Sequence, residues 1–326
     1  MAIRRHDTKT PMAVKIVFLD RDTLGADIRL PEPSFPHEWV SYPRTAPDRR
    51  APRLKGAQIA ITNKVPFDAD LIAALPDLRL IGVAATGTDI IDRAAAAARG
   101  IPVVNVAGYA VNAVPEHVFA ALLSLRRHLP AYRRAVRDGA WQGAEQFCYL
   151  GPQIRDIAGG TLGIAGAGAI GQAVARRAEA FGMRVLFAER KGAGTVRDGY
   201  TAFDRVLGES DVLSLHCPLT RETAGLIDDA ALAAMKPGAI LINTGRGGLV
   251  DEEALLAALE SGRLGGAALD VTRPEPPPTD SAIMRLAARE DVIVTPHIAW
   301  GSVQARQAVA DRLIAEIERH YAALPG

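Results

Sequence analysis

Cysteine and long apolar runs are both scarce in this sequence. Its 326 residues include two cysteines, Cys148 and Cys217, and neither lies in a CxxC or zinc-type cluster. We therefore expect two idle thiols, with no disulfide framework and no metal site. No stretch approaches the roughly 20 apolar residues of a membrane-spanning helix. The apolar run at residues 14–19 is broken by Lys15, which is untypical of a signal peptide. These features predict a cytoplasmic protein.

An excess of charge of one sign is missing as well. The 38 lysines and arginines nearly balance the 37 aspartates and glutamates, which leaves a formal net charge of +1. This balance predicts no strong attraction to nucleic acid or to anionic membranes. The length, by contrast, exceeds that of one ordinary core, and 48% hydrophobic residues can fill sizeable cores. We therefore expect two domains.

The sequence does contain two series of short apolar runs that alternate with longer segments rich in alanine, leucine and arginine. This alternation is typical of βα units around a parallel sheet. The first series predicts strands at residues 14–19, 58–62, 78–83 and 102–105, and helices at 68–75 and 92–98. The second predicts strands at residues 161–165, 184–188, 212–216, 239–243, 266–270 and 292–295, and helices at 170–181, 203–208, 228–235 and 252–261. Six strands suit a full dinucleotide-binding domain.

Two long helices flank the second series. Residues 112–127 place apolar side chains such as Val114, Val118 and Leu122 on one stripe. Such a stripe fits a core-facing helix equally well as a helix that bridges domains or meets a partner subunit. The last helix, residues 303–323, follows the complete second series, so we expect it to pack on the first domain.

These elements predict an α/β protein with two lobes. A Rossmann-type, doubly wound parallel sheet in residues 109–299 would be inserted into a smaller, flavodoxin-like α/β lobe. The smaller lobe, formed by residues 1–108 and 300–326, would bind the substrate.

A glycine pattern opens the second series. It follows an apolar strand and begins an apolar helix, with Gly166, Gly168, Ala169, Ile170 and Gly171 forming the turn between them. Gly166 permits the tight turn, Gly168 lets the backbone approach a pyrophosphate, and Gly171 lets helix and strand pack closely. The pattern predicts a dinucleotide site.

The second strand of this series ends at Glu189. An acid at this place can accept hydrogen bonds from both adenosine ribose hydroxyls and repel the 2′-phosphate of NADP, which favours NAD. Arg190 and Lys191 follow at once and could instead pair with that phosphate. NAD is therefore the expected cofactor, with NADP as the alternative.

Three further segments follow predicted strands of the second series: residues 243–247 (NTGRG), 273–277 (RPEPP) and 295–300 (TPHIAW). Open α/β sheets bind ligands at the carboxyl ends of their strands. Hydride transfer to a carbonyl builds negative charge on oxygen, which calls for a proton donor and a nearby cation. An arginine suits a planar carboxylate, and a carboxylate beside an imidazole favours the protonated ring, so Arg246, Glu275 and His297 are the candidate residues of these segments.

With these motifs the chain resembles the D-isomer-specific 2-hydroxy acid dehydrogenase family over nearly its full length. Within that family it is most similar to glycerate dehydrogenases, also called hydroxypyruvate or glyoxylate reductases. The resemblance rests on the glycine pattern and on residues 19–21 (LDR), 108–112 (GYAVN), 216–220 (HCPLT), 235–251 (MKPGAILINTGRGGLVD) and 296–300 (PHIAW).

The resemblance implies a role for each matching residue. Arg246 would bind the substrate carboxylate and polarise the 2-oxo group, His297 would be the general acid and base, and Glu275 would hold His297. The remaining implied contacts are Cys217, Pro218, Thr244 and Asp270 for the cofactor, and Ala85, Thr86, Gly87 and Trp300 for the substrate. His216 would line the cofactor site without acid–base work. A homodimer formed through residues 112–127 is also implied.

Two features depart from the family pattern. The loop of Glu275 is unusually rich in proline, which alters the approach of the acid, and Gly245 stands where many relatives carry alanine. Two sibling enzymes and one binding protein are the alternatives. Glu275 argues against a formate dehydrogenase, and a short phosphoglycerate dehydrogenase stays open. A cofactor-sensing corepressor-like protein is disfavoured by the balanced charge.

Overall fold

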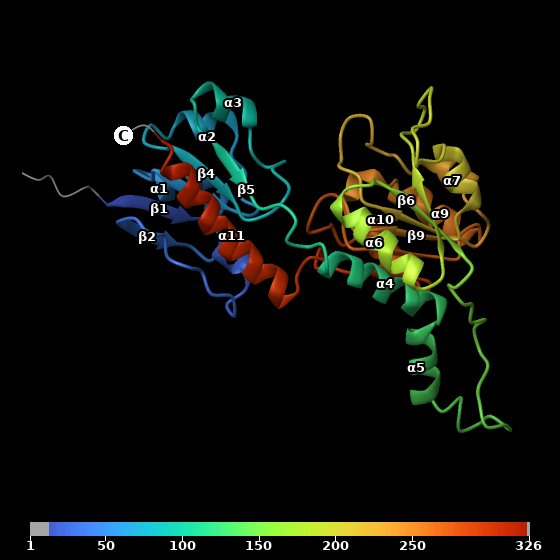
Figure 1. Ribbon diagram of the computed structural model, residues 1–326. Coiled ribbons are helices and arrows are strands. Elements are labelled where there is room, and N and C mark those ends of the chain that lie inside the picture. Colours follow the sequence, from blue (N-terminus) through green and yellow to red (C-terminus); the bar gives the residue numbers. More distant parts are fainter. Residues whose placement is uncertain (1–12, 325–326) are drawn as a thin grey trace, which may run out of the picture. The chain divides into compact units, whose positions relative to one another are not determined.

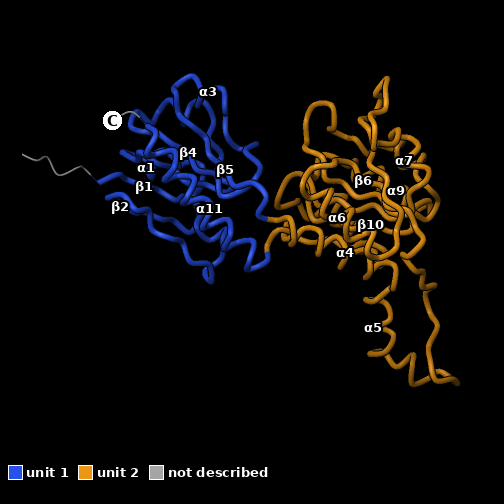
Figure 2. The backbone as a smooth tube through the Cα atoms, in the orientation of Figure 1, with its two compact units in different colours: residues 1–109, 302–326 blue, residues 110–301 orange. Residues whose placement is uncertain are grey.

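The computed structural model describes residues 13–324 (Figure 1). The chain divides into two units, one of residues 1–109 and 302–326, the other of residues 110–301 (Figure 2). It leaves the smaller unit after Tyr109 and returns to it at Ser302. Each unit is built around its own parallel sheet, so the protein has the expected α/β, Rossmann-type two-domain fold.

The smaller unit contains a five-stranded parallel sheet of order β2-β1-β3-β4-β5. Its strands are β1 (Val14–Phe18), β2 (His37–Ser41), β3 (Ile59–Thr62), β4 (Leu80–Val83) and β5 (Val103–Asn105). All four predicted strands are present, because buried parallel strands appear in a sequence as continuous apolar runs. The prediction missed β2, which lies at the edge and carries half-exposed, partly polar residues.

The described part of this unit contains four α-helices. They are α1 (Arg50–Leu54), α2 (Ala69–Ala73), α3 (Arg93–Ala98) and α11 (Val303–Tyr321). As predicted, the last helix packs on the first sheet, against β4 and β5. Gly82 makes this approach possible, because a Cβ there would lie 3.3 Å from Leu313 and 3.2 Å from Ile317 of α11.

The larger unit contains a six-stranded parallel sheet of order β11-β10-β9-β8-β6-β7. Its strands are β6 (Thr161–Ala165), β7 (Arg184–Ala188), β8 (Val212–Leu215), β9 (Ile240–Asn243), β10 (Gly266–Leu269) and β11 (Val292–Val294). β6 pairs with β7 on one side and with β8 on the other, so the winding direction reverses there. Such a reversal opens a crevice at the carboxyl ends of the two strands on either side of it.

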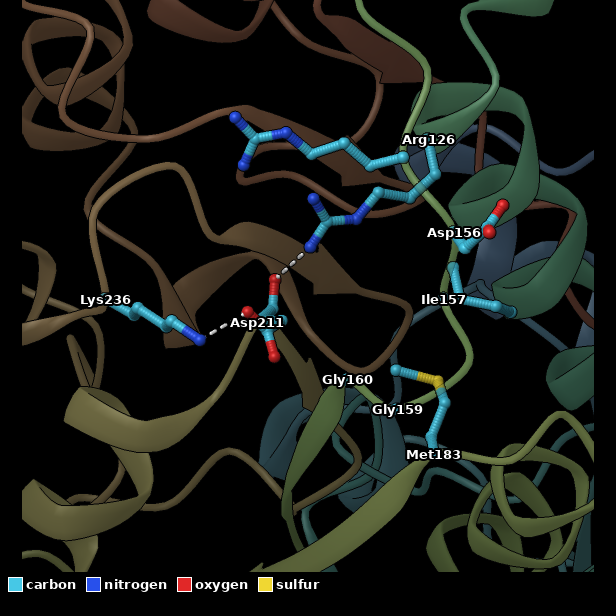
Figure 3. Close-up of a pocket in the computed structure, with 9 residues that line it drawn as sticks. Arg126, Asp156, Ile157, Gly159, Gly160, Met183, Asp211 and Lys236 are labelled. Carbon is cyan, nitrogen blue, oxygen red and sulfur yellow. Dashed lines mark hydrogen bonds and ion pairs between the residues drawn. The ribbon is translucent and has the colours of Figure 1, made fainter.

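The amino ends of the same strands carry an ionic network. The side chain of Asp211, before β8, accepts hydrogen bonds from Lys236 Nζ at 2.6 Å and from the backbone N–H of Thr161 at 2.8 Å. Arg126 donates to the backbone carbonyl of Asp211 at 2.9 Å (Figure 3). Asp211, Lys236 and Arg126 line a cavity of about 310 Å³ together with Arg155, Asp156, Ile157, Gly159, Gly160 and Met183.

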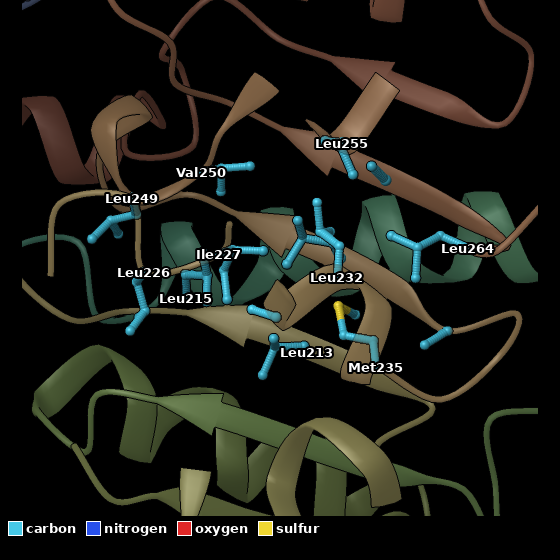
Figure 4. Close-up of a cluster of buried hydrophobic side chains, with 14 of the residues drawn as sticks. Leu213, Leu215, Leu226, Ile227, Leu232, Met235, Leu249, Val250, Leu255 and Leu264 are labelled. Carbon is cyan, nitrogen blue, oxygen red and sulfur yellow. The ribbon is translucent and has the colours of Figure 1, made fainter. Parts of the chain in front are cut away.

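Helices cover the larger sheet, and its core is apolar. The helices are α4 (Ala113–Arg126), α5 (Leu129–Arg137), α6 (Ala169–Ala180), α7 (Phe203–Glu209), α8 (Asp229–Ala234), α9 (Glu252–Glu260) and α10 (Ala282–Ala287). One buried cluster joins strand residues such as Leu213 and Leu215 to helix residues such as Leu232 and Leu255 (Figure 4). This continuous core holds the strand ends in fixed relation to one another.

The structure explains the apolar stripe of residues 112–127. Val114, Val118 and Leu122 are buried, and α4 packs against α6, β9, β10 and β11 of its own unit. The stripe is therefore a core-facing one and does not offer a surface to a second subunit.

Exposed apolar side chains follow α4 instead, in residues 129–154. α5 has no buried residue, and Figure 2 shows it and the segment after it extending from the rest of the larger unit. Phe147 is 91% exposed and Leu150 is 75% exposed. The sequence prediction contained no helix here, because the segment lacks an apolar face that its own unit buries.

Candidate active site

The glycine turn lies where β6 runs into α6, at the reversal point of the larger sheet. Gly166 has φ +108°, and a Cβ there would lie 2.5 Å from the backbone nitrogen of Cys217. A Cβ on Gly171 would lie 2.0 Å from the Gly166 carbonyl oxygen. Both positions therefore require glycine for the fold itself, since any side chain would collide with backbone.

Gly168 has a different reason to be glycine. It caps α6, and a Cβ there would meet no protein atom within 4 Å. Packing within the chain therefore does not exclude a side chain at this position. The open space at the start of α6, where Ala169 and Ile170 follow, would let a ligand group such as a pyrophosphate approach the backbone closely.

A second observation points to the same ligand. Thr244, directly after β9, has a buried hydroxyl oxygen without a hydrogen-bond partner among the residues that the structure describes. Buried hydroxyls normally have a partner, so this one fits a ligand group. At the end of β8, burial raises the pKa of the Cys217 thiol, which stays neutral, and Pro218 is exposed. The residues at this edge fit a dinucleotide.

Glu189 ends the second strand of the unit and is 4% exposed. Its carboxylate forms a bidentate pair with Arg197, with Nε–Oε2 at 2.6 Å and Nη2–Oε1 at 2.8 Å. This pair and the backbone N–H groups of Arg190 and Arg197 lower the pKa of Glu189 to about 2. Lys191 lies elsewhere: it pairs with Asp228 at 2.7 Å. The sequence had suggested Lys191 as a phosphate ligand and had not identified Arg197.

His297 is held by the acid that the sequence assigned to it. Its Nδ1 lies 2.7 Å from Glu275 Oε2, and both side chains are partly exposed. The proline-rich loop of Glu275 does not prevent this contact. His297 itself has φ +55°, a left-handed conformation that is rare outside glycine and is found where surrounding bonds impose it.

Those bonds come from Asp270, which is 2% exposed. The backbone N–H of His297 donates to the Asp270 carbonyl at 2.7 Å. The Asp270 carboxylate accepts the N–H groups of Ile298 at 2.9 Å and Ala299 at 2.8 Å, as well as the Thr295 hydroxyl. Asp270 therefore holds both sides of the loop that carries His297. The sequence had given it only a cofactor contact.

His117 of α4 was also missed. Its Nε2 lies 3.1 Å from the Thr295 hydroxyl oxygen, and that hydroxyl in turn donates to Asp270. A histidine on an apolar helix carries no local sign of such a contact, because its partner is 178 residues away in the chain.

Arg246 follows β9 on a turn that is fixed by Asn243. The buried Asn243 side chain donates to the Arg246 carbonyl at 2.9 Å and accepts the Gly245 N–H at 3.0 Å. A Cβ on Gly247 would lie 2.2 Å from the Thr272 carbonyl carbon. The turn of Arg246 therefore packs directly against the loop that leads to Glu275.

The larger unit thus places Arg246, Glu275 and His297 after β9, β10 and β11, which are neighbouring parallel strands. Trp300 adjoins them and donates from Nε1 to the His297 carbonyl at 3.0 Å. The three predicted substrate residues of the smaller unit, Ala85, Thr86 and Gly87, follow the carboxyl end of β4. Hydrogen bonds to Val106 and Asn105 fix Thr86 there.

The surroundings of His216 indicate a structural role. Its Nε2 lies 2.8 Å from Ser214 Oγ, and burial lowers its pKa to about 4. A histidine with this pKa is neutral near pH 7 and cannot serve as the proton donor there. The exclusion of His216 from the catalytic set is consistent with this environment.

Comparison with known proteins agrees with this geometry. Residues 119–299 match the model of the NAD-binding domain of the D-isomer specific 2-hydroxyacid dehydrogenases. A glycerate dehydrogenase of Methylorubrum extorquens is 50% identical over 96% of this chain and 98% of its own length. A hydroxypyruvate reductase of Blautia hydrogenotrophica is 33% identical over 86% of this chain and 88% of its own.

A solved structure shows the same fold. The D-lactate dehydrogenase of Aquifex aeolicus, complexed with NAD and lactic acid, superimposes with a TM-score of 0.78 at 28% identity, over 94% of this chain and 96% of that one.

Among residues 13–324, every helix is too short or too polar to span a membrane.

Proposed function

The chain belongs to the D-isomer specific 2-hydroxyacid dehydrogenase family, and on that premise we propose that its substrate pair is glycerate and hydroxypyruvate or glycolate and glyoxylate. It is an NAD-dependent oxidoreductase that transfers hydride to and from C2 of a small 2-hydroxy acid. The names of its relatives support these two substrate pairs, and they favour an enzyme over a cofactor-sensing protein.

The observation that carries the catalytic proposal is the pair formed by His297 and Glu275 beside the turn of Arg246. The bound nicotinamide supplies or accepts the hydride. Arg246 binds the substrate carboxylate through paired N–H groups and polarises the 2-oxo group. Because Glu275 engages Nδ1, proton exchange with the substrate oxygen falls to Nε2 of His297, and the hydrogen bond to Glu275 orients the ring for it.

Further residues would hold the two ligands. The cofactor would be held by the glycine turn and by Glu189, Arg190, Cys217, Pro218 and Thr244. Asp270 would bind the nicotinamide amide in addition to holding the His297 loop. Ala85, Thr86 and Gly87 would offer backbone N–H groups to the substrate carboxylate, and Trp300 would form a wall of the substrate pocket. The smaller unit is then the substrate-binding domain.

The test is the absorbance of reduced nicotinamide. Purified protein is mixed with NADH and, in turn, hydroxypyruvate, glyoxylate, pyruvate and phosphohydroxypyruvate. We expect rapid oxidation with hydroxypyruvate or glyoxylate. Preference for phosphohydroxypyruvate would identify a short phosphoglycerate dehydrogenase, and preference for pyruvate would identify a lactate dehydrogenase; either result would overturn the substrate proposal.

A homodimer in the cytoplasm is the second part of the proposal. The exposed apolar residues of the segment 129–154 support it, because contiguous exposed apolar surface marks protein contact sites. We expect light scattering to report a dimer, and replacement of Phe147 and Leu150 by serine to produce a monomer. A wild-type monomer at micromolar concentration would contradict this part.

A further inference from the structure

The carboxylate of Glu189 has a full set of donors from its own chain. Arg197 donates from Nε and Nη2, and the backbone N–H groups of Arg190 and Arg197 donate at 2.8 Å and 3.2 Å. A carboxylate offers about four acceptor positions. The ribose hydroxyls of NAD can therefore bind Glu189 only by displacing bonds that the protein already makes.

Arg197 also changes the charge of the site. Its bidentate pair with Glu189 neutralises the carboxylate, and the guanidinium stacks 3.9 Å above the centroid of the Tyr200 ring. About half of the Arg197 side chain, 54%, stays exposed. The bonds to Glu189 use one edge of the guanidinium. The pair therefore holds the Arg197 guanidinium at the protein surface, where we place the adenosine part of the cofactor.

The neighbouring charged side chains are balanced in sign, so they do not oppose the binding of an anion. Arg190 is exposed and faces Glu222, which is hydrogen-bonded to Thr220. Lys191 instead forms an ion pair with Asp228, with Nζ 2.7 Å from Oδ2. Among these four side chains, each carboxylate is matched by one guanidinium: Glu189 by Arg197, and Glu222 by Arg190. A 2′-phosphate arriving here would meet the guanidinium groups of Arg190 and Arg197, and the carboxylates of Glu189 and Glu222 are each compensated by one of them.

We propose that Arg197 is the residue that sets cofactor selectivity, so that this site binds the 2′-phosphorylated cofactor NADP(H) as well as NAD(H). With NADP(H), Arg197 stays on Glu189 and faces the phosphate. With NAD(H), Arg197 gives up part of its contact, and Glu189 accepts the ribose hydroxyls. The inference rests on cofactor binding by the larger unit, as the proposed function does, but it does not depend on the substrate.

The test measures cofactor binding alone, without any 2-oxo acid. NADH and NADPH are titrated by their nicotinamide fluorescence, and 2′,5′-ADP and 5′-AMP are used as competitors. Wild-type protein should bind NADPH within about tenfold of NADH. NADH must displace a charge-assisted bond between Arg197 and Glu189, and such a bond is worth roughly tenfold or more in affinity. An NADPH affinity more than about a hundredfold weaker than that for NADH would overturn the proposal.

Three variants sharpen the test. Arg197→Met should weaken NADPH and 2′,5′-ADP binding by about tenfold to a hundredfold, since it exposes the charge of Glu189, while NADH changes less than about threefold. Glu189→Gln should weaken NADH while preserving NADPH. Arg205→Met is the matched control, because Arg205 also pairs with a glutamate, Glu209, at the surface of the same unit; it should change neither affinity.

Two results would contradict the assignment of Arg197. Equal weakening of NADH and NADPH in Arg197→Met, with an unchanged melting temperature, would show a merely structural pair. Unaltered binding of both would show that Arg197 does not touch the cofactor site. Failure of every 2-oxo acid in the activity test would leave these binding ratios intact, so the two proposals fail separately.

Discussion

The two ends of the six-stranded sheet both carry charged and polar side chains, but they use them differently. At the amino end, both carboxylate oxygens of Asp211 are engaged by Lys236 and Thr161 of the same unit. At the carboxyl end, His297 engages one ring nitrogen with Glu275, and the Thr244 hydroxyl has no partner within the described residues. Arg126 Nε, in the amino-end network, also has no partner among these residues, so the contrast concerns the ionisable groups. The Asp211 carboxylate is fully used by its own unit, whereas we assign the second ring nitrogen of His297 to the substrate.

The strongest test of this contrast is His297→Asn. We expect the turnover number to fall by about a hundredfold to ten-thousandfold, because the general acid is lost. The melting temperature should stay within a few degrees, since Asp270 holds the loop through backbone groups that the substitution retains. Steady-state kinetics and calorimetry measure the two effects. A variant with more than about a tenth of normal turnover would contradict the role of His297.

Arg246→Gln comes next. It removes the cation that we assign to the substrate carboxylate and the developing oxyanion, and we expect a loss of about a hundredfold to a thousandfold in kcat/KM. Cofactor affinity should be unchanged, because this side chain is assigned to the substrate. Parallel measurement of NADH fluorescence separates the two. Equal losses of cofactor affinity and activity would move Arg246 from the substrate to the cofactor.

At the opposite end, Asp211→Ala should cost stability and spare catalysis. The change leaves the Thr161 N–H without its acceptor and Lys236 and Arg126 without a counter-charge, which we expect to lower the free energy of unfolding by about 1–3 kcal/mol. Urea unfolding measures it, and activity per folded molecule should stay the same. Lost activity in a fully folded variant would erase the distinction between the two ends.

The smallest expected effect near pH 7 concerns His216, a structural residue at the functional end. Burial lowers its pKa from 6.5 to about 4, so the unfolded chain binds this proton more readily than the folded chain. Its contribution to stability is complete above pH 6.5 and is lost as the pH falls toward 4, with a slope of at most about 1.4 kcal/mol per pH unit. His216→Asn should flatten that slope in urea unfolding at several pH values. An unchanged pH dependence would show that His216 takes up its proton equally in both states.

Local sequence predicted the central strands and the motif residues, because buried strands are apolar runs and glycine turns obey strict steric rules. It missed β2, whose polar residues reflect an edge position, and the helix α5, whose apolar side chains stay exposed. It also could not decide what α4 packs against, since a stripe looks the same whether its partner is a core or a subunit.

The site shows the same division. The places of Arg246, Glu275 and His297 after strands could be predicted because a strand and the residue that follows it are local properties, whereas their catalytic roles stay a prediction. The hold of Asp270 on the His297 loop and the pairing of Arg197 with Glu189 were not predicted. Both depend on which loops the sheet brings together, and neither partner lies in a motif that names the other.

The route of the chain has a consequence for the order in which the protein is made. Residues 110–301 form the larger unit without a break, whereas the smaller unit needs α11, whose Leu313 and Ile317 lie over Gly82. Domains fold as units while the chain leaves the ribosome. The surface of β4 and β5 that α11 covers therefore stays open until the last helix emerges, and the unit that begins later is the first that can finish folding.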